Sequence, residues 1–165
     1  EAIRSYVEAG GGYLGICGGA YLCSAHYSWS LNLVDTQVFT GAREVEGLGK
    51  KQMWYRGKAA AVKMQLTEAG QRVFEDIPEI VTVQFQNGPI VSRKKLPELA
   101  DYRVLAYFRT EKVLYPPQKG TMIDTPAVVE GKFGQGRIIS ISPHPEATKG
   151  LEPMIEYAVR AIAGE

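Results

Sequence analysis

Apolar residues recur along the chain in two spacings that predict helices separated by short strands. Helical spacing occurs over residues 1–10 and 152–163, where every third or fourth position is apolar. A further helix is expected over residues 67–76, ending before Pro78. Another helix is expected to begin directly after Cys17, in a glycine-rich stretch without strand alternation. The chain therefore predicts helices in its opening, middle and closing parts.

Short apolar or alternating runs, bounded by glycine, asparagine and proline, predict the strands. They cover residues 13–16, 59–66, 80–86, 104–108, 127–129 and 137–142. The last two flank the turn-prone segment 131–136, which predicts a late β-hairpin. Strands separated by helices predict an α/β sheet whose functional site lies at the carboxyl ends of the strands.

Composition narrows the class of protein. The 165 residues are 45% hydrophobic and 22% charged, which fits a single domain spanning residues 1–165. The net charge of +1 supplies no broad field for a polyanion, so neither nucleic acid nor an anionic membrane is an expected partner. No apolar run reaches the roughly 18 to 20 residues of a membrane span. A cytoplasmic protein with reduced cysteines at Cys17 and Cys23 is expected.

Cys17 lies in the sequence Gly-Ile-Cys-Gly-Gly, at the junction of a buried strand and a helix. The flanking glycines are expected to allow a sharp turn that exposes the Cys17 side chain above the sheet. The amino end of the helix is expected to lower the pKa of the thiol and make it a nucleophile. The Gly18 N–H would then face an oxyanion on the attacked carbon. The alternative is that Cys17 is a small buried apolar residue.

His144 and Glu146 follow a strand and alternate with two prolines in the sequence Ser-Pro-His-Pro-Glu. In extended backbone, residues two apart face the same side, so the carboxylate is expected to orient the imidazole. His144 would act as the general base toward Cys17. The alternative is an ordinary proline-rich turn with two exposed polar side chains.

These motifs resemble the class I glutamine amidotransferase-like superfamily. The resemblance rests on Gly-Ile-Cys-Gly-Gly-Ala-Tyr at residues 15–21 and on Ser-Pro-His-Pro-Glu at residues 142–146, which follows a glycine-rich hairpin. Within that superfamily, residues 6–21 and the Asn-Gly-Pro sequence at residues 87–89 are most similar to the biotin-protein ligase amino-terminal domain group.

The resemblance implies a fold and a catalytic set. The fold is a flavodoxin-like three-layer sandwich with a mostly parallel sheet, a nucleophile elbow and the late hairpin. Members of the superfamily begin with a strand, a helix and a strand, which we expect to be missing upstream of Glu1. The implied catalytic set is Cys17, His144 and Glu146. No cofactor and no metal are expected.

Tyr21 departs from the superfamily pattern, because members that hydrolyse glutamine usually carry Gln four residues after the nucleophile. Tyr21 is therefore a candidate pocket residue that argues against glutaminase activity. Other aromatic residues that could cover a pocket are Tyr27, Trp29, Trp54 and Tyr55.

Asn87 and Gly88 follow a predicted strand and are simplest to explain as a turn. Their place at a strand end also makes them candidate pocket residues.

Three functions remain open from the sequence. The first is a thiol-dependent hydrolase or acyl transferase acting on a small amide or ester, with a partner chain or synthase domain as a further option. The second is a non-catalytic binding or regulatory domain, which Tyr21 and the missing opening segment favour. The third, a redox or glyoxalase-like activity, ranks last, because such proteins usually place an acidic residue near the cysteine and the nearest one before Cys17 is Glu8.

Overall fold

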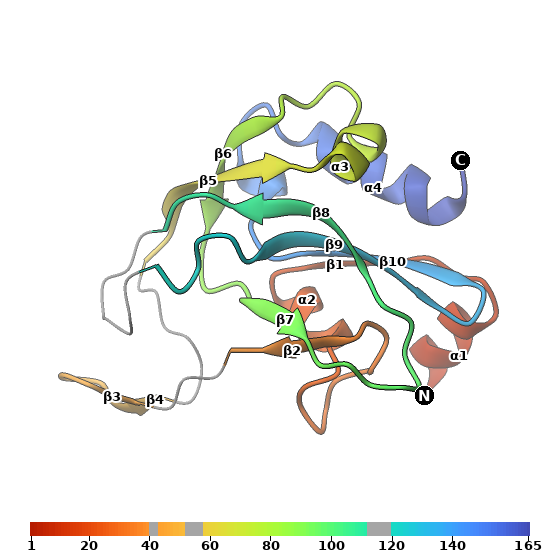
Figure 1. The fold of residues 1–165 in the computed structure, drawn as a ribbon, viewed down its shortest axis with the longest axis horizontal. Coiled ribbons are helices and arrows are strands. Elements are labelled where there is room, and N and C mark those ends of the chain that lie inside the picture. The colour runs from red at the N-terminus through yellow and green to blue at the C-terminus, as the bar shows by residue number, and fades with distance from the viewer. Residues whose placement is uncertain (40–42, 52–57, 112–119) are drawn as a thin grey trace.

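A six-stranded sheet forms the middle layer of the protein (Figure 1). In this computed structural model, the described residues are 1–39, 43–51, 58–111 and 120–165. In spatial order the strands are β1 (Tyr13–Ile16), β10 (Gly136–Ile141), β9 (Pro126–Phe133), β8 (Arg103–Phe108), β5 (Ala60–Leu66) and β6 (Ile80–Phe85). The predicted α/β class is confirmed.

Further elements cover both faces of this sheet (Figure 1). One face carries α3 (Glu68–Val73) and α4 (Pro153–Ala163). The other carries α1 (Ala2–Glu8), α2 (Gly18–Cys23) and the pair β2 (Thr36–Val38) and β7 (Val91–Arg93). The strands β3 (Arg43–Val45) and β4 (Gly49–Lys51) form a separate ribbon, and the 3-10 turn η1 (Pro145–Ala147) follows β10. The expected three layers are present.

The core lies on both sides of the sheet, and β10 shows why. Ile138 and Ile139 are both fully buried, although neighbouring side chains of a strand point to opposite faces. Ile138 packs in the cluster that includes Val7 of α1, whereas Ile139 packs in the cluster that includes Met154 of α4. A strand covered on both faces needs apolar residues at successive positions, which explains the continuous run in β10.

The direction of the strands differs from the expected mostly parallel sheet. Only β1 and β10 run parallel, and every other neighbouring pair in the six-stranded sheet is antiparallel. β9 and β10 pair antiparallel across a short turn, which confirms the predicted hairpin. Hydrophobic alternation marks a strand without fixing its direction, so the antiparallel pairing of β5 with β6 and β8 was not apparent from the sequence.

The sheet curls, and its last strand approaches the segment that leaves β10. Although β6 and β1 stand at opposite ends of the strand order, Gln84 of β6 forms an isolated antiparallel bridge with His144. The His144 N–H donates to the Gln84 carbonyl at 2.8 Å. The curl therefore brings β6 to the place where β1 and β10 end.

Cys23 makes the stability of the folded state depend on pH in the alkaline range. Its thiol is fully buried, and burial raises its pKa from 9.0 to about 11. Between those values the unfolded thiol ionises while the folded thiol stays protonated, so the folded state loses stability as pH rises. Two pKa units correspond to about 3 kcal/mol.

We predict that the free energy of unfolding, measured with urea between pH 8 and 11, falls less steeply in Cys23→Ala than in the wild type. The cost of the lost sulfur is the same at every pH and does not affect the comparison of slopes. Tyr102, whose pKa burial raises to about 12, is present in both proteins and cancels. Burial, together with the charge of Cys23, raises the Tyr13 pKa to about 12, so Cys23→Ala also reduces the Tyr13 contribution and changes the slope in the same direction. Equal slopes in the two proteins would contradict the prediction.

Candidate functional site

Cys17 occupies a strained corner between β1 and α2. Its N–H donates to the Ile141 carbonyl at 2.9 Å, which continues the parallel pairing of β1 with β10 by one residue. Its backbone then turns with φ 48° and ψ −96°, outside the usual regions for a residue with a side chain. Such strain is maintained where the surrounding structure holds it, and it clusters at functional sites.

The glycines beside Cys17 have different roles. A Cβ on Gly15 would lie 2.6 Å from the Gly19 carbonyl oxygen, so α2 can pack against β1 only because Gly15 lacks a side chain. Apart from its neighbours in the chain and the backbone of α2, no atom of the described residues lies within 4 Å of the position that a Cβ on Gly18 would take. Gly15 therefore fits the predicted role in forming the turn, whereas Gly18 leaves open space next to Cys17.

The prediction that the Cys17 pKa is lowered is wrong in direction. Burial is the largest effect and raises the pKa of the half-buried thiol above its ordinary value of 9.0. A hydrogen bond from the Gly18 N–H lowers this pKa, and the negative charge of Glu146 raises it further. The dipole of a helix as short as α2, which has six residues, does not overcome burial. At neutral pH the resting thiol is protonated.

His144 and Glu146 are in direct contact. The His144 Nδ1 and the Glu146 Oε1 are 2.7 Å apart, and the two side chains are 20% and 41% exposed. The chain between them is the 3-10 turn η1 rather than the extended backbone that the sequence suggested. Glu146 engages Nδ1, which leaves Nε2 as the ring nitrogen suited to exchanging a proton with a substrate or a thiol.

Thr148 holds the backbone of His144 against β6. The Thr148 hydroxyl donates to the His144 carbonyl at 2.7 Å and accepts a hydrogen bond from the Gln84 N–H at 2.9 Å. Together with the bond from the His144 N–H to the Gln84 carbonyl, these contacts form a closed clamp. Sequence reasoning missed both Thr148 and Gln84.

Cys17 and His144 meet the same short segment at the end of β6. The Cys17 thiol donates to the Gln86 carbonyl at 3.5 Å, and the His144 N–H donates to the Gln84 carbonyl. Two residues span at most about 7 Å of chain, so both candidate catalytic residues are brought to one locality. In this resting geometry the thiol donates to Gln86 rather than to His144. Gln86 was also missed, and its only sequence signal is its place before a turn.

The predicted pocket residues Tyr21, Asn87 and Gly88 lie next to this locality. Tyr21 is a buried residue of α2, and its hydroxyl donates to the Asn87 carbonyl at 3.0 Å. A Cβ on Gly88 would lie 2.1 Å from the Ser142 carbonyl oxygen, so the loop can approach the end of β10 only with glycine there. The Ser142 hydroxyl donates to the Pro89 carbonyl at 2.7 Å. The loop is thus fixed between α2 and the residues before His144.

The described residues also contain an aromatic pair, but they contain neither a metal-binding cluster nor a membrane-spanning helix. Tyr27 and Trp29 stack with ring centroids 4.6 Å apart, whereas Trp54 and Tyr55 lie outside the described residues. Within the described ranges, no three His, Cys, Asp or Glu side chains are grouped so that they could hold a metal ion. None of the described helices is long and apolar enough to cross a membrane.

Solved structures with the same fold come from several kinds of protein. A Thermoplasma acidophilum protein assigned as one of the subunits of GMP synthase is 15% identical, with a TM-score of 0.55, covering 99% of this chain and 63% of that one. PurLQS from Thermotoga maritima is 14% identical, with a TM-score of 0.55, covering 98% of this chain and 65% of that one. A β-galactosidase from Bacillus circulans sp. alkalophilus is 11% identical, with a TM-score of 0.53, covering 98% of this chain and 20% of that one.

These similarities show a glutamine amidotransferase-like fold, and at such low identity they show the fold alone. The chain spans between a fifth and about two thirds of the length of these proteins. No curated protein matches the sequence. The family described as "Biotin-protein ligase, N terminal" matches residues 1–161. The strained cysteine corner, the histidine after β10 and this match over nearly the whole chain agree, and the chain belongs to the biotin-protein ligase N-terminal family.

Proposed function

We propose that this domain catalyses thiol-dependent hydrolysis of, or acyl transfer from, a small amide or ester. Cys17 is the nucleophile, His144 the acid and base, and Glu146 the group that orients His144. The Gly18 N–H, whose proximity to the Cys17 sulfur acts to lower the pKa of the thiol, is suited to the oxyanion, and the open space beside Gly18 leaves room for a substrate carbonyl.

One observation carries this proposal. Cys17 and His144 follow two different strands and lie more than a hundred residues apart in the sequence. Nevertheless, the Cys17 thiol donates to the Gln86 carbonyl and the His144 N–H donates to the Gln84 carbonyl, only two positions away. The 2.7 Å contact between Glu146 and the His144 Nδ1 adds the third member of a nucleophile, base and orienting set.

The reaction begins when the Cys17 side chain rotates from the Gln86 carbonyl toward His144. The thiol proton passes to the His144 Nε2, and the sulfur forms a bond to the substrate carbonyl carbon. The C–N or C–O bond then breaks, and His144 returns the proton to the leaving amine or alcohol. Water, or another acceptor activated by His144, attacks the thioester and releases the acyl group with the free thiol.

A second candidate function is a binding or regulatory domain without turnover. The raised pKa of Cys17 favours it, because a protonated thiol is a poor nucleophile. Tyr21 favours it as well, because it stands where superfamily members that hydrolyse glutamine usually carry Gln. Turnover and thiol reactivity distinguish the two candidates.

We predict that Cys17→Ala lowers hydrolysis of small activated esters and amides by at least about a hundredfold, because it removes the atom that forms the covalent intermediate. Rates above the buffer background are measured by release of a coloured leaving group. Cys23→Ala is the matched control and keeps the wild-type rate, since the Cys23 thiol is fully buried and donates to the Ala20 carbonyl. A Cys17→Ala variant that turns over at the wild-type rate with an unchanged melting curve would refute the assignment.

We predict that iodoacetamide alkylates Cys17 more slowly than a free cysteine at pH 7, with a midpoint in the pH profile above the free-thiol value. Glu146→Gln lowers that midpoint, because it removes a negative charge that disfavours the thiolate. Peptide mass spectrometry follows each cysteine separately, and the buried Cys23 stays unmodified.

Glu156→Gln is the control for this profile, since Glu156 is paired with Arg160 on α4 and is not among the groups that shift the Cys17 pKa. A Cys17 midpoint that is below the free-thiol value, or that is equally displaced in Glu146→Gln and Glu156→Gln, would contradict the electrostatic account.

A further inference from the structure

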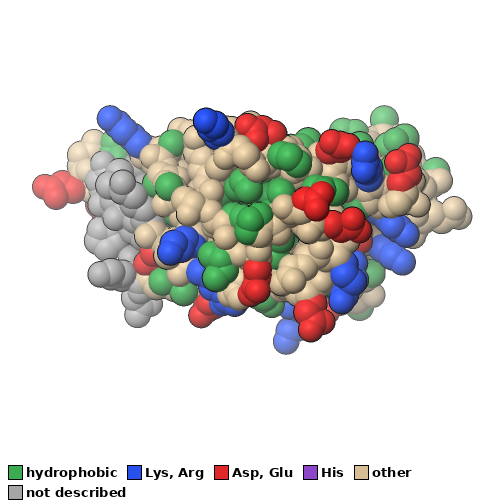
Figure 2. All heavy atoms as spheres, turned by 90° about the horizontal axis from the view of Figure 1, so that it is seen from above, with side chains coloured by type: hydrophobic (Ala, Val, Ile, Leu, Met, Phe, Trp, Pro, Cys, Tyr) green, Lys and Arg blue, Asp and Glu red, His purple; other side chains and the backbone are tan. Residues whose placement is uncertain are grey.

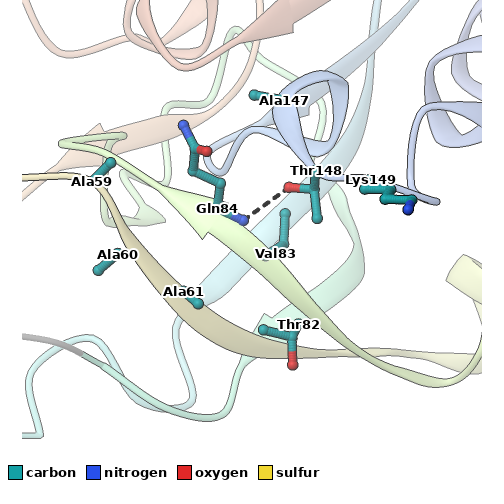
Figure 3. A pocket seen from close by; sticks show the side chains of 9 residues that line it. All are labelled: Ala59, Ala60, Ala61, Thr82, Val83, Gln84, Ala147, Thr148 and Lys149. Atoms are coloured by element: carbon teal, nitrogen blue, oxygen red, sulfur yellow. Dashed lines mark hydrogen bonds between the residues drawn. The ribbon is translucent and has the colours of Figure 1, made fainter.

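A groove on the outer face of β5 and β6 adjoins the clamp that holds His144 (Figure 3). Its volume is about 360 Å³. The residues that line it come from the start of β5, from β6 and from the turn after η1: Ala59, Ala60, Ala61, Thr82, Val83, Gln84, Ala147, Thr148 and Lys149. Its volume would hold about a dozen waters at roughly 30 Å³ each, which suits a small molecule rather than a peptide.

The groove has room for a ligand because several of its lining residues are alanines, whose side chains are single methyl groups. Ala61 lies opposite Gln84 in the register of β5 and β6, on the face that points away from the core. Figure 3 shows the Gln84 side chain projecting from β6, with Ala59 on one side and Ala147 on the other. A ligand here meets alanine methyl groups together with the Gln84 amide and the Thr82 hydroxyl.

The charge around the groove is positive. Lys149 lines it, Lys58 directly precedes Ala59, and Lys63 lies opposite Thr82 on the same outer face. Elsewhere the charges are mixed, and Figure 2 shows basic and acidic side chains interspersed over one side of the molecule. All three lysines are exposed, and within the described ranges none of their ammonium groups pairs with a carboxylate. The lining residues include neither Asp nor Glu. The nearest acidic residue in sequence, Glu146, is bonded to His144. These features favour an anion.

The groove also touches the backbone clamp of His144. Thr148 and Gln84 line the groove, and the same two residues hold the His144 carbonyl and N–H. A ligand that contacts Thr148 and Gln84 therefore acts on the segment that positions the candidate base.

We propose that this groove binds a small oxyanion that carries a short aliphatic group, with the anion toward Lys149 and the aliphatic part against the methyl groups of Ala59 and Ala61. The site is separate from the Cys17 thiol, and binding there perturbs His144 through Thr148 and Gln84. A carboxylate and a phosphate would both supply such an oxyanion.

The test is an NMR titration of the ¹⁵N-labelled protein with sodium butyrate at pH 7, with sodium chloride adjusted to keep ionic strength constant. The expected result is saturable shifts of the Thr82, Gln84, Thr148 and His144 amides with one midpoint, at about 10 mM or below for so small a ligand. Neutral butyramide binds at least about fivefold more weakly, because it lacks the charge. Inorganic phosphate, titrated separately, shows whether the oxyanion binds without the aliphatic part.

Variants make the result specific to the groove. Lys149→Gln weakens butyrate at least about fivefold, whereas Lys132→Gln, an exposed lysine on β9, leaves the midpoint unchanged. Ala61→Leu fills the groove and abolishes the shifts. Cys17→Ala binds butyrate like the wild type, because the groove does not include the thiol. The titration therefore tests the groove even if Cys17 proves not to be catalytic.

The proposal is overturned by shifts that rise linearly without saturation, by butyramide binding as well as butyrate, or by equal midpoints in Lys149→Gln and Lys132→Gln. Saturable binding of phosphate as well as butyrate supports the oxyanion site, and the ratio of their midpoints identifies which source the groove prefers.

Discussion

The hydrogen bond from the His144 N–H to the Gln84 carbonyl is the contact on which the site depends. In the sheet order, β9, β8 and β5 stand between β6 and β10, so the contact is possible only because the sheet curls. Thr148 reinforces the contact by bonding to both residues. With the sheet curled in this way, the Cys17 thiol reaches the Gln86 carbonyl, and the three candidate catalytic residues share one locality.

The resting site combines features that favour chemistry with one that opposes it. The strained Cys17 backbone, the Gly18 N–H and the contact of His144 with Glu146 suit nucleophilic catalysis. Burial and the Glu146 charge keep the thiol protonated. These features are compatible if a substrate carbonyl draws the sulfur away from Gln86 and toward His144, because the imidazolium formed then neutralises Glu146 and stabilises the thiolate.

Features set by neighbouring residues were predictable from the sequence. The corner at Cys17, the hairpin of β9 and β10, and α4 follow from glycine placement and hydrophobic periodicity. Features set by residues far apart were not predictable. The antiparallel direction of β5 and β6, the Gln84 and Gln86 contacts, and the raised pKa of Cys17 depend on tertiary packing. The contact of His144 with Glu146 was expected, but a 3-10 turn produces it instead of an extended chain.

Catalysis by this site, as we propose it, requires that Cys17 forms a covalent acyl intermediate with the help of His144. The most direct measurement is intact-protein and peptide mass spectrometry after rapid quenching of a reaction with a p-nitrophenyl ester. We expect a single acyl adduct on Cys17, formed much more slowly in His144→Ala and absent in Cys17→Ala. An unmodified Cys17 in the wild type, or an adduct that forms equally fast without His144, would contradict it.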